Sequence, residues 1–307
     1  MLKENMKQVL ITGGSGLVGG RLTELLEKKN YRVAHLSRSQ ESTADREIIS
    51  WDVNKMNLSP KAIEKFDHII HLAGAGIVDE PWTEKRKKVI VDSRVKSAQL
   101  LAKAIAQNEK KPESFVSASA VGFYGFVSGE HVFSEEDPSG NDFLGQTCQL
   151  WEESVEQMAK MNIPTAKIRI GIVLSEKGGA LKEMARPIKM GFGAALGSGK
   201  QYLPWIHIDD LCGIFIHAME NKLKGAYNAA APVQHNNKTF TKKLAKVLNK
   251  PLWLPNVPEF VMKIILGKRA LLVLEGSRVA VDKIQATGFK FKYDSLESAL
   301  ENLYKKD

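Results

Sequence analysis

Three regularly spaced glycines, Gly13, Gly16 and Gly19, stand near the start of the chain. A short apolar run over residues 8–11 precedes them, and a helical pattern of leucines follows. A strand, a glycine-rich turn and a helix in this order cradle the pyrophosphate of a dinucleotide, because the glycines allow a tight turn and close approach of the backbone to phosphate. The N–H groups and the dipole at the helix start favour the negative charge. The pattern predicts cofactor contacts from Gly13, Ser15, Gly16, Leu17, Val18 and Gly19.

A basic residue follows the second predicted strand, residues 32–36. In dinucleotide-binding folds an acidic residue at this place binds the ribose 2′-hydroxyl and selects NAD. Here Arg38 stands between Ser37 and Ser39, and a guanidinium beside two hydroxyls suits a 2′-phosphate. The sequence therefore predicts NADP(H) as the cofactor, the alternative being an ordinary surface arginine.

Two hydroxyls, Ser117 and Ser119, stand at the end of the fifth predicted strand, residues 114–119. They share one face, because side chains alternate along a strand. A hydroxyl at the carboxyl end of a strand, facing the nicotinamide, can polarise a carbonyl or stabilise an alkoxide. The alternative is that such serines are satisfied by backbone groups. We expect Ser117 to contact the cofactor.

Short apolar runs alternate with helical stretches from residue 8 to residue 171, which predicts a parallel sheet covered on both faces. The expected fold is α/β, a Rossmann-type doubly wound parallel sheet with a smaller, mostly helical C-terminal substrate domain. We expect an NADP(H)-binding domain over residues 1–174, to which residues 203–230 return, and a substrate-binding portion over residues 175–307. The fourth strand, residues 68–75, contains Leu72, Ala73 and Gly74, and its small residues let the backbone lie against the cofactor.

A long amphipathic helix is predicted over residues 83–107, and it carries Ser93 and Arg94. Two interpretations of Arg94 stay open at this point. Its side chain either reaches the cofactor or substrate, or forms a salt bridge along the helix.

Composition limits the class of protein. The chain has 307 residues, of which 43% are hydrophobic and 26% charged, as in ordinary globular proteins. No apolar run is long enough to span a bilayer, and the first strand begins too early for a signal peptide. The cysteines, Cys148 and Cys212, form neither a disulfide framework nor a metal pattern, so we expect a reducing cytoplasm and no metal.

The net charge of +9 comes from lysines that are scattered rather than clustered with aromatic residues. Such lysines indicate a solvated surface, or secondarily a field that attracts anionic nucleotides. Since no nucleic-acid recognition motif occurs, we expect an anionic small molecule as partner, and neither nucleic acid nor membrane.

Several motifs together carry a resemblance to a known family. With Thr12 in front, the G-x-x-G-x-x-G turn resembles the extended short-chain dehydrogenase/reductase superfamily. Four later segments narrow the resemblance: S-A-S-A-V-G-F-Y-G from Ser117, C-x-x-W-E from Cys148, R-I-G-I-V-L-S-x-x-G-G-A-L from Arg169, and G-S-G-x-Q-x-x-x-W-I-H-I-D-D-L from Gly197. They resemble the YfcH/SulA-like epimerase-family proteins, atypical members of that superfamily that are named nucleoside-diphosphate-sugar epimerases. The resemblance runs from residue 8 to about residue 303.

The resemblance implies roles for individual residues. Asp52, at the end of the third predicted strand, falls near the adenine, and Ser119 takes the place of the serine that hydrogen-bonds the reacting oxygen. Tyr124 is the closest substitute for a catalytic base. Arg278 resembles an arginine that grips a diphosphate, the alternative being a packing salt bridge. The implied substrate residues are Trp82, Arg186, Gln201, Trp205, Asn228 and Arg278.

The sequence departs from the superfamily at its catalytic pair. The usual tyrosine and the lysine four residues later lie on one helix face, and the lysine lowers the pKa of the tyrosine. Leu144 takes the tyrosine place here and Cys148 the lysine place. Leucine cannot transfer a proton, and a neutral thiol cannot supply the charge of a lysine. The YfcH/SulA-like branch lacks the same pair.

Two functions remain open from the sequence. The first is an NADP(H)-dependent epimerase or oxidoreductase that acts on a nucleotide sugar or a similar anionic small molecule, with a non-standard active site. The second is an NADP(H)-binding regulatory or structural protein with little or no catalysis, which the resemblance connects with cell division. A homodimer through the helices at residues 83–107 and 143–160 is expected by analogy with the superfamily.

Overall fold

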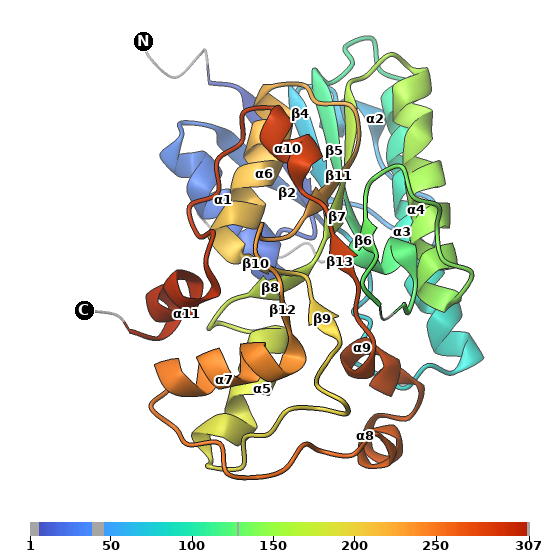
Figure 1. The fold of residues 1–307 in the computed structure, drawn as a ribbon. Coiled ribbons are helices and arrows are strands. Elements are labelled where there is room, and N and C mark those ends of the chain that lie inside the picture. The colour runs from blue at the N-terminus through green and yellow to red at the C-terminus, as the bar shows by residue number, and fades with distance from the viewer. Residues whose placement is uncertain (1–5, 39–45, 128, 306–307) are drawn as a thin grey trace.

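The computed structural model describes residues 6–38, 46–127 and 129–305. Its main sheet has seven strands in the order β11-β7-β5-β4-β1-β2-β3, and all pairings are parallel (Figure 1). The strands are β1 (Gln8–Thr12), β2 (Arg32–Ser37), β3 (Ile48–Ser50), β4 (His68–His71), β5 (Ser114–Ala120), β7 (Thr165–Ile170) and β11 (Gly225–Ala229). The order reverses between β1 and β4, and sheets of this kind bind ligands outside the carboxyl ends of the strands at that switch point. The predicted Rossmann-type sheet is confirmed.

Helices cover both faces of the sheet. Figure 1 shows α1 (Leu17–Lys28) and α6 (Ile208–Glu220) on one face, and α3 (Glu84–Ala106) and α4 (Phe143–Lys160) on the other. Strands buried on both faces are nearly continuous apolar runs, as residues 9–11 are, and these three side chains have no exposed area. The buried strands hold the loops at their carboxyl ends in fixed positions.

A second hydrophobic core lies beyond the carboxyl ends of these strands. It is built around Trp205 and Phe240, and it receives side chains from α5 (Ala180–Lys189), α7 (Asn237–Val247) and α11 (Leu296–Tyr304). The remaining elements are α2 (Pro60–Ile63), η1 (Val121–Tyr124), β6 (Val132–Phe133), β8 (Ile172–Leu174), β9 (Tyr202–Leu203), β10 (Trp205–His207), β12 (His235–Asn236), α8 (Glu259–Leu266), η2 (Gly267–Ala270), α9 (Leu271–Leu274), β13 (Arg278–Val279) and α10 (Asp282–Ala286). The domain boundary at residue 174 stays a prediction.

Two acidic residues, Asp209 and Asp210, stand in the first turn of α6, and aspartate is a common N-cap residue. His207 is the cap, and its Nδ1 accepts from the Asp209 N–H at 3.1 Å. The two carboxylates have other partners: Asp209 pairs with Arg21 at 2.7 Å, and Asp210 accepts from two backbone N–H groups near residue 292. They therefore join α6 to α1 and to the C-terminal segment.

Two strands are shorter than predicted. β3 ends at Ser50 and leaves Asp52 in a turn, where its carboxylate accepts from the Lys55 N–H at 2.9 Å. β4 ends at His71, so residues 72–75 form a loop beyond the sheet edge. Within the described part of the chain, no helix has the length and apolar character needed to cross a membrane.

Candidate functional site

The glycine turn between β1 and α1 has the geometry of a phosphate cradle. Gly13 adopts φ +70°, and its carbonyl accepts from the Gly16 N–H at 3.0 Å. A Cβ at Gly19 would lie 2.4 Å from the Gly13 carbonyl oxygen, so this position requires glycine. By contrast, Gly16 is exposed, and a Cβ there would meet only that carbonyl, at 3.3 Å. The turn therefore packs tightly against the protein at Gly13 and Gly19, and its backbone is accessible to solvent at Gly16.

The helix that follows this turn leaves its first N–H groups available. Gly16 is the N-cap of α1 without a side-chain cap, and no acidic residue stands in the first turn. The uncancelled positive end of the helix dipole favours an anion. Together with the open face at Gly16, this fits a dinucleotide pyrophosphate.

The ring of His35 packs against the glycine turn. A Cβ at Gly14 would lie 2.5 Å from the His35 ring, so a glycine is needed here too. The His35 Nε2 lies 2.9 Å from the hydroxyl of Thr23, which donates to the Gly19 carbonyl at 2.8 Å. Burial lowers the pKa of His35 to about 4, so the ring is neutral near pH 7. Sequence reading missed this residue, although a histidine within a buried strand was a signal.

His71 connects the turn to the loop after β4 and to α3. The Thr12 hydroxyl accepts from the Leu72 and Ala73 N–H groups at 3.1 and 3.0 Å, so it donates its proton to His71 Nδ1 at 2.8 Å. The opposite nitrogen, Nε2, then carries the hydrogen that points to Ser97 on α3, at 3.2 Å. Burial, and secondarily the charge of Arg94, lowers the pKa of His71 to about 3. The chain of contacts requires the neutral ring.

The other residues predicted to contact the cofactor lie near the carboxyl ends of the strands of the main sheet. Arg38 is exposed directly after β2, and Ser37 is the last residue of that strand. Ser39 lies outside the described residues. Asp52 is half-buried in the turn after β3. Leu72, Ala73 and Gly74 form the loop after β4, and a Cβ at Gly13 would be 3.1 Å from the Leu72 carbonyl carbon.

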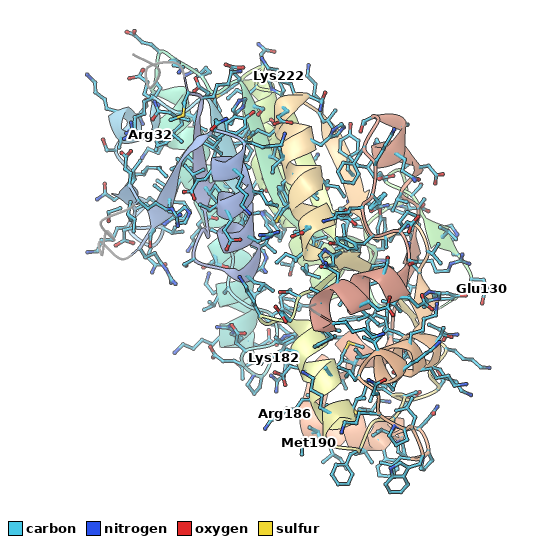
Figure 2. The ribbon with its side chains drawn as sticks, turned by 90° about the vertical axis from the view of Figure 1, so that its left-hand side faces the viewer. Arg32, Glu130, Lys182, Arg186, Met190 and Lys222 are labelled. Carbon is cyan, nitrogen blue, oxygen red and sulfur yellow. The ribbon has the colours of Figure 1, made fainter. Side chains whose placement is uncertain are left out.

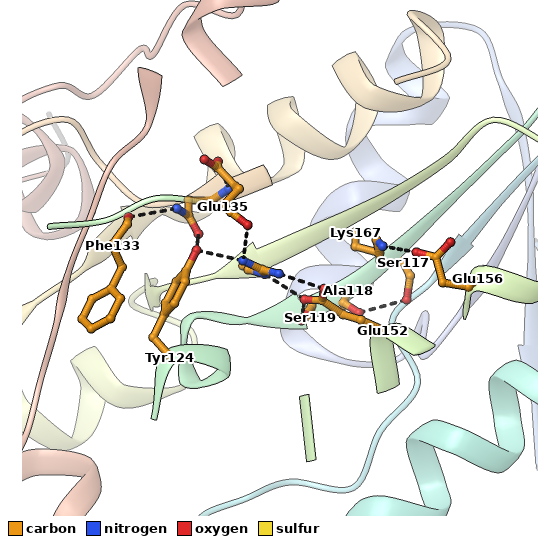
Figure 3. Close-up of polar contacts among 11 residues, drawn as sticks. Ser117, Ala118, Ser119, Tyr124, Phe133, Glu135, Glu152, Glu156 and Lys167 are labelled. Atoms are coloured by element: carbon orange, nitrogen blue, oxygen red, sulfur yellow. Dashed lines mark hydrogen bonds and ion pairs between the residues drawn. The ribbon is translucent and has the colours of Figure 1, made fainter. Parts of the chain in front are cut away.

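The two predicted catalytic residues belong to one buried network (Figure 3). Ser119 donates to Glu152 of α4 at 2.7 Å, and Glu152 accepts two hydrogen bonds from Arg169 of β7, at 2.9 and 3.0 Å. Arg169 also donates to the Tyr124 hydroxyl at 3.0 Å, and that hydroxyl donates to Asn228 at 2.7 Å. All five side chains are buried. Ser119 and Tyr124 are thus held by a satisfied ion pair.

This network changes what Ser119 and Tyr124 can do. Burial raises the pKa of Tyr124 to about 12, and the positive charge of Arg169 only partly opposes it. Tyr124 therefore makes a poor base near pH 7. The face that Ser119 and Ser117 share is turned towards α4, where Ser117 is buried and donates to the Ala118 carbonyl at 2.9 Å. Their roles at the cofactor stay predictions.

The places of the usual tyrosine and lysine are apolar in the folded protein. Leu144 packs in a small cluster with Trp82 and Ile90. The Trp82 indole donates to the Ile77 carbonyl at 2.8 Å, and its ring contacts Phe143. Cys148 is buried, which raises the pKa of its thiol to about 12. Neither place offers a group that exchanges a proton or carries a charge near pH 7.

The remaining substrate candidates differ in exposure. Trp205 and Gln201 are buried: the Trp205 indole donates to the Val233 carbonyl, and the Gln201 amide donates to the Val273 carbonyl at 2.7 Å. They lie in the interior instead of facing an open cleft. Arg186 is exposed on α5 beside Lys182 and Met190, in a surface hollow that Tyr304 also lines (Figure 2).

The other two candidates lie near β13. Arg278 stands 4.9 Å from the Tyr202 ring and 3.9 Å from the exposed Glu130 carboxylate, a weak ion pair. Asn228, beyond its bond to Tyr124, donates to the Ala280 carbonyl at 3.0 Å. Its amide is therefore occupied by protein groups.

The class of protein follows from the fold and the turn. A doubly wound parallel sheet with an open glycine turn at its switch point defines a Rossmann-type nucleotide-binding protein. Residues 9–230 match the NAD dependent epimerase/dehydratase family, and residues 257–303 match a domain of unknown function, DUF1731. The chain belongs to the NAD dependent epimerase/dehydratase family. This assignment is consistent with an atypical short-chain dehydrogenase/reductase.

Individual relatives support this assignment over the full length. The chain is 36% identical to the epimerase family protein YfhF of Bacillus subtilis, over 96% of this chain and 97% of that one. It is similar to the human epimerase family protein SDR39U1 (isoform 2), crystallised with NADPH, with a TM-score of 0.88, 30% identity and coverage of 97% and 99%. A nucleoside-diphosphate sugar epimerase from Corynebacterium glutamicum aligns with a TM-score of 0.80 and 28% identity, covering 98% of this chain and 58% of that one.

Proposed function

We propose that the protein is an NADP(H)-dependent oxidoreductase or epimerase that acts on a nucleotide sugar or a similar anionic small molecule. The observation that carries the proposal is the glycine turn, which is closed by glycines at positions 13 and 19 and open at Gly16, above an uncapped helix. A nicotinamide dinucleotide is the ligand that this fold and this family bind. NADP(H) is favoured by Arg38 and by the NADPH of the human relative.

When bound, the cofactor supplies hydride transfer. The N–H groups at the start of α1 bind and orient its pyrophosphate, and Arg38 binds the 2′-phosphate. Leu144 and Trp82 exclude water on one side of the proposed reaction site.

The chain offers no ordinary base at the tyrosine position, and Tyr124 is buried with its pKa raised to about 12. The proton therefore passes through water or a group on the substrate. A simple reduction tolerates this better than an epimerisation, which needs both oxidation and re-reduction in one pocket.

The experiment for the cofactor is a titration of the purified protein with NADPH and NADH, followed by nicotinamide fluorescence. Arg38→Ala should weaken NADPH binding about 10- to 100-fold, the value of one charged contact to phosphate, and leave NADH binding unchanged. Arg32→Ala is the matched control, because Arg32 is an exposed arginine at the other end of β2. Equal affinity of the wild type for both dinucleotides would contradict the NADP(H) preference. If neither binds, the proposed function is wrong.

The buried network favours a second function. Because Ser119 and Tyr124 are held by Arg169 and Glu152, the same structure suits a protein that binds NADP(H) without chemistry and acts through partners. NADPH oxidation in the presence of nucleotide sugars and simple carbonyl compounds separates the two functions. Oxidation that depends on one of these compounds supports the enzyme, whereas tight binding of NADPH without turnover across the panel supports the binding protein.

A further inference from the structure

Arg94 is a buried cation that pairs with no carboxylate among the described residues. It lies on α3 with 8% of its area exposed, and none of the ion pairs among the described residues includes it. Its Nη1 donates to the Ala75 and Ile90 carbonyls at 3.1 and 2.9 Å. No described residue accepts a hydrogen bond from its Nε or Nη2. The salt bridge along the helix, one of the two interpretations of the sequence, is therefore absent from the described chain.

The groups around Arg94 leave its charge uncompensated. The Cys148 thiol would oppose this charge if it ionised, but burial keeps it neutral with its pKa raised to about 12. The Trp151 ring, 5.0 Å from the guanidinium carbon, offsets only part of the desolvation cost. An arginine stays charged in proteins, so a buried and unpaired one is costly. Such a cost is typical of a group that a ligand neutralises.

The guanidinium lies against an exposed glycine of the loop after β4. A Cβ at Gly74 would lie 3.1 Å from the guanidinium carbon and 3.3 Å from Nη2 of Arg94, and Gly74 is exposed. Gly74 belongs to the loop after β4, against which Gly13 of the glycine turn packs. Arg94 also lies close to Cys148, the place of the usual lysine. A side chain at position 74 would therefore press on the guanidinium and cover it on the exposed side of the loop.

We propose that Arg94 binds an oxyanion of the ligand, a phosphate or carboxylate group that lies against Gly74, through Nε and Nη2. It supplies from α3 the positive charge that the fold usually supplies from α4. A planar guanidinium fork with two free N–H directions matches such a group. The inference rests on the proposed function for the place of the cleft. The oxyanion comes either from the dinucleotide diphosphate or from the substrate.

The experiment measures binding of two probes, NADPH and inorganic pyrophosphate, by calorimetry. Arg94→Met removes the charge and keeps an unbranched apolar stem, and Arg94→Lys retains the charge without the fork. Lys96→Met is the matched control, because Lys96 lies on the same helix and pairs on the surface with Asp92. Pyrophosphate is titrated into free protein and into protein saturated with NADP⁺, and the urea unfolding midpoint of each variant is recorded.

The expected result is a loss of about 30-fold or more in affinity for Arg94→Met, partial recovery in Arg94→Lys and no change in Lys96→Met. A loss for NADPH assigns the oxyanion to the cofactor, and a loss only for pyrophosphate on NADP⁺-saturated protein assigns it to the substrate. Wild-type affinities of Arg94→Met for both probes, with an unchanged unfolding midpoint, would overturn the inference. Failure of the wild type to bind NADPH would instead overturn the proposed function, and pyrophosphate titration of the free protein would still test Arg94.

Discussion

Two buried arginines on the α3–α4 side of the sheet have opposite environments. Arg169, with 4% of its area exposed, meets Glu152 through two hydrogen bonds and also contacts Tyr124. Arg94, with 8% exposed, donates to two backbone carbonyls and contacts the Trp151 ring, and it meets no carboxylate among the described residues. Burial costs desolvation free energy for both charges, but only the charge of Arg169 is compensated by a carboxylate of the protein. A buried charge that is paired within the protein is typical of a residue that stabilises the fold. A buried charge without a partner, beside an exposed glycine, is typical of a ligand-binding site.

The same difference in environment bears on the two predicted catalytic residues. Ser119 and Tyr124 belong to the satisfied region, where each already has partners of the right polarity. A ligand is therefore easier to place at the Gly74 loop and the glycine turn than at these two hydroxyls, whose catalytic roles stay predictions.

The largest expected effect is that of Arg169→Met, which would leave Glu152 buried without its counter-charge. Removing one partner of a buried pair costs about 3–5 kcal/mol in the free energy of unfolding. Urea denaturation followed by circular dichroism measures it. The double variant Arg169→Met with Glu152→Met should recover part of this loss, because no charge remains to be desolvated. A single-variant loss below about 1 kcal/mol would mean that the pair is not structural.

A smaller loss is expected for Tyr124→Phe. The variant keeps the ring but removes the hydroxyl between Arg169 and Asn228, and leaving buried partners unsatisfied costs about 1–3 kcal/mol. Its NADPH affinity should equal that of the wild type. If Tyr124→Phe instead unfolds like the wild type but abolishes turnover of a substrate, the residue is a proton donor after all.

The fold could be predicted from the sequence because each helix and strand depends on residues that are close together in the chain. The glycine turn, the buried strands and the helix from residue 84 each follow from neighbouring residues, and the parallel order follows from their alternation. The bounds differ by only a few residues, as at β4, where the chain leaves the sheet after His71. Interactions of this range need no knowledge of the tertiary packing.

The site was harder to predict because its partners are distant in the sequence. Two acids one helical turn apart on α4, Glu152 and Glu156, face two cations on alternate residues of β7, Lys167 and Arg169. Each pair is visible as a pattern, but their contact requires the register of the fold. Arg94 did carry a local signal: positions 90, 91, 97 and 98 hold no acidic residue, so no partner exists within one turn of its helix.

Acid should weaken the connection that His71 makes between the glycine turn and α3, because protonation of His71 would remove the acceptor of the Thr12 hydroxyl. The folded-state pKa of about 3 lies below the unfolded value near 6.5, so the unfolded state binds the extra proton and stability falls as pH falls below about 6.5. At pH 5 this histidine alone contributes a loss of up to about 2 kcal/mol.

Urea unfolding between pH 7 and pH 5 measures this loss. The pH dependence should be weaker in His71→Gln, which does not titrate. It should also be weaker in Arg94→Met, because the charge of Arg94 is the second cause of the lowered pKa. An equal slope in the wild type and His71→Gln would show that other groups dominate the acid response.

The smallest effect on stability is expected for Arg94→Met in the absence of ligand. The variant loses two hydrogen bonds to carbonyls and a contact with the Trp151 ring, but it also removes the desolvation cost of an unpaired charge. These contributions oppose each other, so the free energy of unfolding should change by less than about 1 kcal/mol, against the several kcal/mol of Arg169→Met. A loss as large as that of Arg169→Met would show that the two environments do not differ.

The stabilisation by bound NADPH should differ between the variants of the two arginines. NADPH at 100 times the wild-type dissociation constant stabilises the wild type by about 2.7 kcal/mol. If Arg94 binds the cofactor and Arg94→Met weakens it about 30-fold, the same concentration stabilises the variant by only about 0.9 kcal/mol. Arg169→Met should keep the full stabilisation, because Arg169 is committed to Glu152. Thermal unfolding with and without NADPH gives both values, and the contrast fails if the two variants lose ligand stabilisation equally.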